Sequence, residues 1–273
     1  MHKWDWYQTT VFMSIESVIS RFKGSAIHDL SDIKIATPRN GYTHAVSFVR
    51  GDHAHCTLFY GGNPGVNILS SGPDAPALAE FMRSFDEHYP TRVDACVDLA
   101  RPGLFDELAR GMLRFAVRKG LTINQQGDWE RGRARTLYIG SRSSPVRLRM
   151  YEKGCQMIDR YGDTSADPFW VRVEVEVKPK IHARPIVSRW SPSDAFTRAC
   201  RWLSELWEAL GWGSYAPFAI GTVREEIDTL RQRFAFARQY GRVCEQWIVD
   251  AGSPEEFVKQ FRALRSEMGS SRA

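Results

Sequence analysis

The sequence has no long apolar run and no closely spaced cysteines. No stretch approaches the roughly 18 consecutive apolar residues that a membrane helix needs, and the first residues, MHKWDW, lack the apolar run of a secretory signal peptide. The five cysteines are at least forty residues apart, which fits neither zinc spacing nor a disulfide framework. We therefore expect a soluble protein of a reducing cytoplasm.

A phosphate-binding glycine loop with its lysine is also absent, which argues against an ATPase in this chain. The composition is otherwise that of a globular protein, with 43% hydrophobic and 25% charged residues in a chain of 273. Such a chain has ample material for a core.

Positive charge is concentrated in one segment. The whole chain has a formal net charge of +5. Residues 131–153 contain six arginines and one lysine against one glutamate, a sum of +6, so the rest of the chain sums to −1. A basic stripe on a balanced protein is expected for a protein that binds a polyanion, although a solvated, arginine-rich pair of strands has the same composition.

Strand and helix patterns divide the chain into two regions. The order strand, helix, strand, strand, strand occurs over residues 1–90 and again over 91–190, and only helical patterns follow over 191–273. The sequence predicts an α+β fold: an antiparallel sheet built from two β-α-β-β-β halves, with a helical C-terminal appendage. Strands are predicted at 4–11, 42–50, 56–60, 66–69, 91–100, 135–139, 146–151 and 170–178, and helices at 14–23, 74–88, 102–119, 195–210, 222–240, 243–250 and 254–265.

Three predicted strands each carry polar side chains on a single face. Alternation places Asp94 and Asp98 on one side of their strand, and Glu174 opposite a row of valines. Arg147 and Arg149 share a face of a third strand. An antiparallel sheet has a wet face where such residues belong, but neighbouring strands would also bring them into one mixed site. Carboxylates for a metal, arginines for phosphate and a nearby tyrosine are the parts of a metal-assisted phosphoryl transfer.

An ordered set of motifs resembles the replication initiation factor family, which comprises rolling-circle initiators of small plasmids and filamentous phages, with related relaxases of conjugative elements. The resemblance covers residues 90–180, with weaker similarity in the N-terminal half and at 236–241. The motifs are Arg92-Val-Asp94-x-x-x-Asp98, Thr136-Leu-Tyr138-Ile-Gly140-Ser-Arg142-Ser-Ser144, Leu148-Arg149-Met-Tyr151-Glu-Lys153-Gly154 and Val171-Arg172-Val-Glu174-Val-Glu-Val-Lys178.

The resemblance implies a DNA nicking and joining enzyme of the bacterial cytoplasm. A tyrosine attacks a phosphodiester at the origin, stays joined to the 5′ phosphate, and leaves a 3′ hydroxyl that primes synthesis. A divalent metal, Mg²⁺ or Mn²⁺, polarises the phosphate, and arginines offset charge in the transition state. A tyrosine with an ordinary pKa near 10 also needs a base or the metal to remove its proton. The implied partners are origin DNA, a host helicase, a host polymerase and a second copy of the chain in a homodimer.

Tyr138 is our candidate nucleophile because it precedes a Gly-Ser turn, where a side chain at a strand end reaches a phosphate. Tyr151 is the alternative, since it lies among basic residues, although a packed aromatic has the same surroundings. Arg149 and Lys153 are expected to assist catalysis. The residues expected to bind DNA are Arg133, Arg135, Arg142 and Arg147.

Asp94, Glu174 and Asp98 are the candidate metal ligands. Asp98 follows Asp94 by four residues, about 13 Å along a regular strand, so the two share an ion only if a bulge intervenes. His53 and His55 are a second possibility, because many rolling-circle nickases bind metal through two histidines that flank a hydrophobic residue. Surface histidines without a ligand are the simpler interpretation.

These assignments carry a structural expectation and leave other functions open. We expect Asp94, Glu174, Arg147 and Arg149 on one concave face, with Tyr138 at its edge. The main alternative function is a sequence-specific DNA-binding protein, a repressor or structural protein, that has the fold and the basic face without the chemistry. An RNA-binding or RNA-processing protein uses the same charge pattern.

Overall fold

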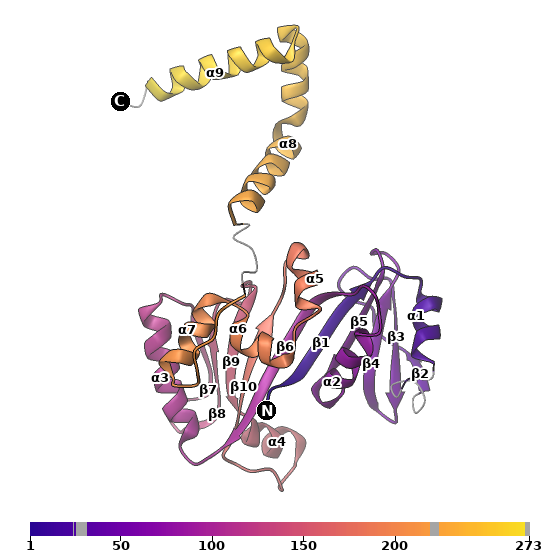
Figure 1. Cartoon of the computed structure of the whole chain (residues 1–273), viewed down its shortest axis with the longest axis vertical. Helices are drawn as coiled ribbons and strands as arrows, with labels where there is room; N and C mark the ends of the chain where they lie inside the picture. Colours follow the sequence, from indigo (N-terminus) through magenta and orange to yellow (C-terminus); the bar gives the residue numbers. More distant parts are fainter. Residues whose placement is uncertain (24, 26–31, 219–223, 271–273) are drawn as a thin grey trace. The chain divides into compact units, whose positions relative to one another are not determined.

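A computed structural model describes residues 1–23, 25, 32–218 and 224–270 of the chain. In these residues a ten-stranded sheet has the order β2-β3-β4-β5-β1-β6-β10-β9-β8-β7, and its paired strands are antiparallel (Figure 1). The strands are β1 (Lys3–Val11), β2 (Asp32–Ile35), β3 (His44–Arg50), β4 (His53–Tyr60), β5 (Val66–Ser71), β6 (Tyr89–Ala100), β7 (Ile123–Asp128), β8 (Arg133–Ile139), β9 (Val146–Glu152) and β10 (Trp170–Val177).

The helices separate and flank these strands. They are α1 (Ile15–Phe22), α2 (Ala75–Met82), α3 (Leu104–Arg118), α4 (Lys153–Tyr161), α5 (Arg184–Val187), α6 (Pro192–Arg198), α7 (Arg201–Ala209), α8 (Arg224–Ala251) and α9 (Pro254–Ser270). Short 3-10 turns occur at Gly72–Asp74 and Ile181–Ala183. None of the helices in the described part of the chain is long and apolar enough to cross a membrane.

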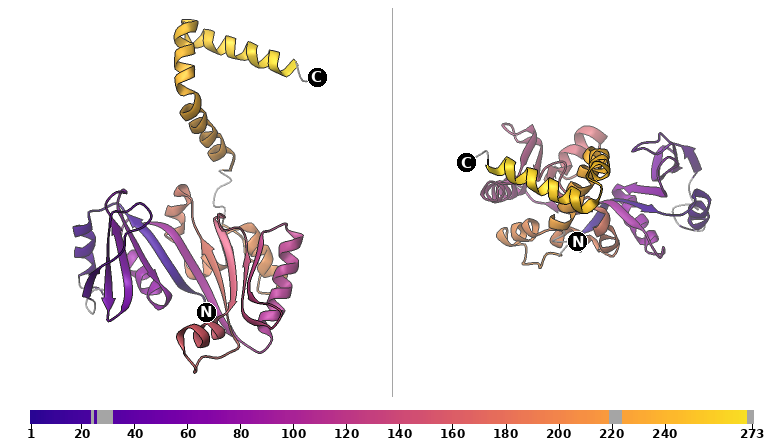
Figure 2. Two further views of the ribbon diagram at one scale, coloured as in Figure 1. Left: turned by 180° about the vertical axis from the view of Figure 1, so that it is seen from behind. Right: turned by 90° about the horizontal axis from the view of Figure 1, so that it is seen from above.

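The order of the strands shows two similar halves. β1 and β6 pair at the centre; β5, β4, β3 and β2 extend from β1, and β10, β9, β8 and β7 extend from β6. In each half a strand and a helix are followed by a meander that returns to pair with the first strand. Seen from behind in Figure 2, the indigo and purple strands of one half and the pink strands of the other flank this centre. The predicted α+β fold is confirmed, with one more strand in each half, β2 and β7.

The core lies on one face of the sheet. Alternation turns Val93 and Ala95 of β6 and Val173 and Val175 of β10 to this face, where all four are buried. Helix α2 packs on β1, and α5 and α6 pack on β6. Complete burial of each valine contributes about 1.5 to 3 kcal/mol. The intervening residues of the same strands therefore face the other side, and those are the polar ones.

The chain separates into two compact units, Met1–Ile220 and Gly221–Ala273. The second unit contains α8 and α9, which are joined by Trp247: its ring packs edge-on against Phe257 at 5.1 Å, and its Nε1 donates to Gln260 at 2.8 Å. Helices α6 and α7 belong to the first unit, although they fall within the predicted region 191–273. The predicted domain boundary after residue 190 stays a prediction.

Candidate active site

Strand register aligns three of the candidate residues in one row. Tyr138 of β8 lies opposite Arg149 of β9, and Arg149 lies opposite Glu174 of β10. Directly opposite residues of antiparallel strands point to the same face. The row therefore crosses three strands on the face opposite the core.

A second row lies next to the first. Arg147 of β9 is opposite Glu176 of β10, which is opposite Asp94 of β6. Together the two rows line one pocket, here called the tyrosine pocket. Its lining consists of three arginines, three carboxylates and one tyrosine: Arg92, Arg147, Arg149, Asp94, Glu174, Glu176 and Tyr138.

Tyr138 is half-buried in this pocket. The guanidinium of Arg147 lies over its ring, 3.9 Å from the centroid, so a cation stacks on the phenol. Within the described residues, nothing hydrogen-bonds the Tyr138 hydroxyl. The strand ends just after it because Gly140 has φ +93°, a conformation that a residue with a Cβ rarely adopts.

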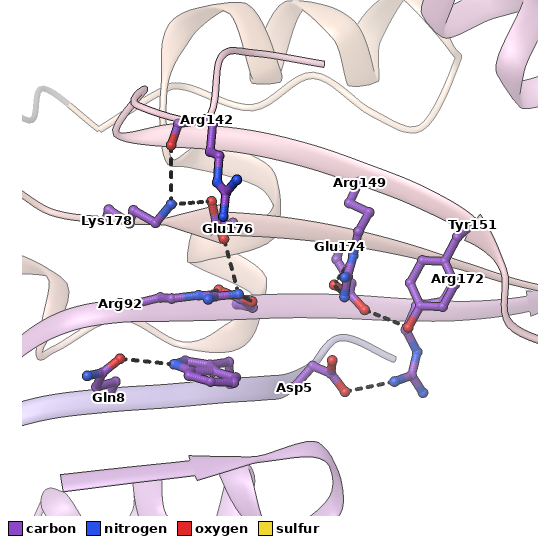
Figure 3. A network of polar contacts seen from close by, with 12 residues as sticks. Asp5, Gln8, Arg92, Arg142, Arg149, Tyr151, Arg172, Glu174, Glu176 and Lys178 are labelled. Carbon is purple, nitrogen blue, oxygen red and sulfur yellow. Dashed lines mark hydrogen bonds and ion pairs between the residues drawn. The ribbon is translucent and has the colours of Figure 1, made fainter. Parts of the chain in front are cut away.

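Tyr151 also has an arginine over its ring, Arg149 at 4.8 Å from the centroid, but it differs from Tyr138 in burial and in the bonding of its hydroxyl. It is only 7% exposed, and its hydroxyl donates to Oε1 of Glu174 at 2.8 Å (Figure 3). Burial and the Glu174 charge raise the pKa of Tyr151 well above its ordinary value. Tyr151 is a packed phenol with a structural hydrogen bond.

Glu174 and Arg149 form an ion pair in the wall of the tyrosine pocket, with a buried carboxylate and a partly exposed guanidinium. Arg149 donates Nε to Oε2 of Glu174 at 2.8 Å, and its Nη2 contacts the same oxygen. Glu174 is 2% exposed, and this burial raises its pKa to about 7, although the Arg149 charge opposes the rise.

Asp94 is held in the same way by Arg92. Arg92 donates Nε to Oδ1 at 2.9 Å and Nη2 to Oδ2, and its Nη2 also lies 3.1 Å from Glu176. The other side of this guanidinium covers the ring of Trp6 at 4.3 Å. Burial raises the pKa of Asp94, and the hydrogen bonds from Arg92 oppose this.

Asp98 does not line the tyrosine pocket. It accepts Nε of Arg172 at 2.6 Å, Nε1 of Trp170 at 2.7 Å, and the Lys3 amine at 2.7 Å. Burial opposes its ionisation, but these hydrogen bonds outweigh burial and lower its pKa to about 2. The three carboxylates predicted to bind metal are thus each paired with a cationic side chain, and they do not surround one point. As arranged, they do not fit a metal ion.

A different cluster brings possible metal ligands together. Nε2 of His53 lies 2.6 Å from one oxygen of Asp74, and Nδ1 of His55 lies 2.8 Å from the other. The three ligand atoms lie within 4.8 Å of one another, so this cluster could hold a metal ion, and no other such group occurs among the described residues. Nε2 of His55 is buried, and it has no hydrogen-bond partner within the part of the chain that the structure describes. β4, which carries both histidines, is three strand spacings from β6, about 14 Å.

Arg135, expected to bind DNA, lies on the core face of β8 with Leu137. Its guanidinium donates to Asp106 at 2.6 Å and Glu152 at 2.8 Å, and covers the ring of Phe105 at 4.3 Å. With 8% of the residue exposed, Arg135 is not available to a phosphate.

The other basic candidates are more accessible. Arg133 is exposed and pairs with Asp159 at 2.8 Å, and Arg142 is exposed in the turn after β8. Lys153 begins α4, where its amine donates to Gln156 at 2.8 Å, and it does not line the tyrosine pocket. Of the predicted basic residues, the pocket itself contains only Arg147 and Arg149.

Sequence reasoning missed three residues of these sites. Arg92 and Glu176 share the polar alternation of their strands with residues already chosen, and this signal was sufficient to find them. Asp74 follows β5, and no pattern in the sequence relates it to the histidines of β4.

The segment that builds the tyrosine pocket has known relatives. Residues 91–206 match the sequence profile of a family described as replication initiation factor. No curated protein is detectably similar to the chain. A solved structure, a rolling circle replication initiator protein from Geobacillus stearothermophilus, has 19% sequence identity and a TM-score of 0.49, with coverage of 77% of this chain and 83% of that one. The resemblance inferred from the motifs is confirmed by the profile: over residues 91–206, this chain matches the replication initiation factor family.

Proposed function

We propose that the protein starts rolling-circle DNA replication by nicking one strand at an origin through a covalent 5′-phosphotyrosine on Tyr138, and that it later rejoins the strand. One observation carries the proposal. A half-buried tyrosine, whose hydroxyl has no hydrogen-bond partner in the described part of the chain, shares a pocket with three arginines inside the segment that matches the replication initiation factors.

In the proposed cleavage, the Tyr138 oxygen attacks the scissile phosphorus. The Tyr138 hydroxyl loses its proton as its oxygen bonds to phosphorus. The bond from phosphorus to the 3′ oxygen breaks, and this oxygen takes up a proton, so that the net transfer is of one proton from the phenol to the 3′ hydroxyl. Attack by a 3′ hydroxyl on the phosphotyrosine reverses the step and joins the strand. The Arg147 guanidinium lies over the phenol ring, 3.9 Å from its centroid, and so places a positive charge beside the proposed nucleophile. Arg147 and Arg149 are oriented to offset the charge that develops on the phosphoryl oxygens.

The contrast between the two tyrosines supports Tyr138 over Tyr151. A nucleophile must lose its proton and reach the phosphorus. Tyr151 is buried, its pKa is raised, and its hydroxyl is committed to Glu174. Tyr138 is only half-buried, and its hydroxyl has no hydrogen-bond partner among the described residues.

We propose a divalent metal as cofactor, held by His53, His55 and Asp74. Two imidazoles and one carboxylate suit Mn²⁺ better than Mg²⁺, which prefers an all-oxygen shell. A divalent ion, when bound, acts as a Lewis acid towards phosphoryl oxygens. Because β4, which carries the two histidines, is three strand spacings from β6, the stabilisation of charge in the tyrosine pocket is assigned to its arginines.

Origin DNA is the proposed partner. Arg133, Arg142 and Arg147 remain as proposed phosphate contacts, whereas Arg135 and Lys153 are left out because of their positions. A host helicase, a polymerase and a homodimer stay predictions.

Nicking of a supercoiled plasmid that carries the protein's own origin tests this function. With Mn²⁺ or Mg²⁺ present, the expected product is an open circle with protein bound to its 5′ end. Specific DNA binding without a nick or an adduct would leave a non-catalytic DNA-binding protein as the function.

A further inference from the structure

We propose that Asp94 and Glu174 are positioning residues, which hold Arg92 and Arg149 in place to bind DNA phosphate, and that they are not metal ligands. The inference rests on the proposed function, in that the tyrosine pocket is taken to receive a phosphate of DNA.

Both oxygens of the Glu174 carboxylate already accept hydrogen bonds from side chains of the pocket wall. Oε2 receives Nε and Nη2 of Arg149, and Oε1 receives the hydroxyl of Tyr151. The Glu174 side chain is 2% exposed, whereas that of Arg149 is 36% exposed. A buried acid thus fixes a guanidinium whose other edge is open to the pocket. A planar, preorganised guanidinium is well suited to bind phosphate oxygens with two parallel hydrogen bonds.

Asp94 and Arg92 repeat this arrangement on the neighbouring strand. The Asp94 side chain is 3% exposed and that of Arg92 is 29% exposed. Trp6 supports one side of the guanidinium, and Glu176 provides a second acidic contact. Figure 3 shows Arg92, Glu174 and Glu176 on adjacent strands facing the same side.

The charges of the pocket favour the same interpretation. The formal charges of its three guanidiniums and three carboxylates sum to zero. A metal bound to the carboxylates would have to displace the arginines that pair with these buried acids, which is costly because it disrupts the compensation of buried charges. A phosphate can instead bind the open edges of arginines that are already oriented, without reorganising the pocket.

Asp98 and Arg172 provide a matched control on the same face. Arg172 donates two hydrogen bonds to Asp98, as Arg149 does to Glu174. The Arg172 side chain, however, is only 8% exposed and lies outside the tyrosine pocket. Loss of this pair should lower the stability of the fold without changing the affinity of the protein for DNA.

The test measures binding of an origin oligonucleotide by fluorescence anisotropy over a range of salt concentrations, in the Tyr138→Phe background so that no cleavage occurs. Glu174→Gln should weaken binding roughly 10-fold and reduce the salt slope by about one, because Arg149 is no longer held. Arg149→Gln should do the same, and the double variant should lose little more. Asp98→Asn should change affinity less than twofold.

Measuring metal affinity distinguishes a role in positioning the arginines from a role as metal ligand. Mn²⁺ affinity, measured by calorimetry on the same proteins, should be the same in Glu174→Gln and Asp94→Asn as in the parent. Loss of Mn²⁺ binding in either variant, with an unchanged salt slope, would overturn the proposal.

Arg149→Lys keeps the test decisive if Glu174→Gln does not fold. Lysine keeps the charge and the partner for Glu174 but has no planar fork, so affinity should again fall roughly 10-fold. Unchanged affinity would overturn the proposal. Because these measurements report binding alone, a failure of the parent protein to nick its origin would refute the proposed function without changing their outcome.

Discussion

Replacing Asp98 with Asn tests how strongly the polar face is held together by its ion pairs. The pKa of Asp98 falls from 3.8 to about 2 in the folded protein. Each pKa unit corresponds to about 1.4 kcal/mol, so the shift amounts to roughly 2.4 kcal/mol. The Asp98 side chain is 24% exposed, and solvent screening reduces this to about 2 kcal/mol. Asp98→Asn should therefore lower the free energy of unfolding by about 2 kcal/mol at pH 7.

The cost should also depend on pH in a defined direction. Since the folded pKa of Asp98 is depressed, the folded state binds fewer protons than the unfolded state between about pH 2 and 4. The stabilisation is complete above about pH 5, is lost as the pH falls through the folded pKa, and is about 1 kcal/mol at pH 3.

Urea unfolding followed by far-UV circular dichroism at pH 7 and pH 3 measures both values. Glu80→Gln is a suitable control because Glu80 forms an exposed i,i+3 pair with Arg83, and its loss should cost less than about 0.5 kcal/mol. Equal costs for the two variants at pH 7, or an Asp98→Asn cost that does not change with pH, would refute the reasoning.

Three further predictions follow from the placement of single residues. Arg135→Gln should destabilise the protein by about 3 kcal/mol, because it leaves Glu152 and Asp106 unpaired. The affinity for DNA should stay unchanged. Weaker DNA binding by the folded variant would contradict the burial of Arg135. Arg142→Ala should lower the salt slope of DNA binding by about one without changing stability, as measured by anisotropy. Mn²⁺ at 100 times its Kd should raise the Tm of the parent by about 5 to 10 °C, and the control variant His44→Ala should show the same rise. His53→Ala and His55→Ala should show no rise. An equal rise in all four proteins would exclude the cluster as the metal site.

Much of the fold could be predicted because alternation and turns are local signals. The alternating valines of β10 indicate a strand and its buried face, and the glycine turns around β4 indicate where neighbouring strands end. β7 was missed because its sequence, INQQGD, is polar and has no alternation. The predicted helix 195–210 is interrupted at Cys200, which adopts an extended conformation with φ −160°, so α6 and α7 are separate.

The sequence predicts which face of the sheet carries the site, but it does not predict which side chains pair with one another there. Alternation was sufficient to place Asp94 and Glu174 on the polar side. Whether a carboxylate on the polar face binds a metal or pairs with a guanidinium depends on the register of the strands. The register places Glu174 opposite Arg149, so that its carboxylate accepts hydrogen bonds from Arg149 and Tyr151. Arg135 was assigned to DNA from charge alone, although its parity with Leu137 already turns it to the core face.

The most direct test of the central claim maps the covalent adduct. The parent, Tyr138→Phe and Tyr151→Phe are each incubated with a labelled origin strand and metal, and the protein-bound 5′ end is quantified and located by peptide mass. Phenylalanine at 138 removes only a hydroxyl that has no partner among the described residues, so fold and DNA affinity should survive within about 1 kcal/mol. The account predicts an adduct on Tyr138 in the parent and in Tyr151→Phe, and none in Tyr138→Phe. An adduct that persists in Tyr138→Phe would contradict it.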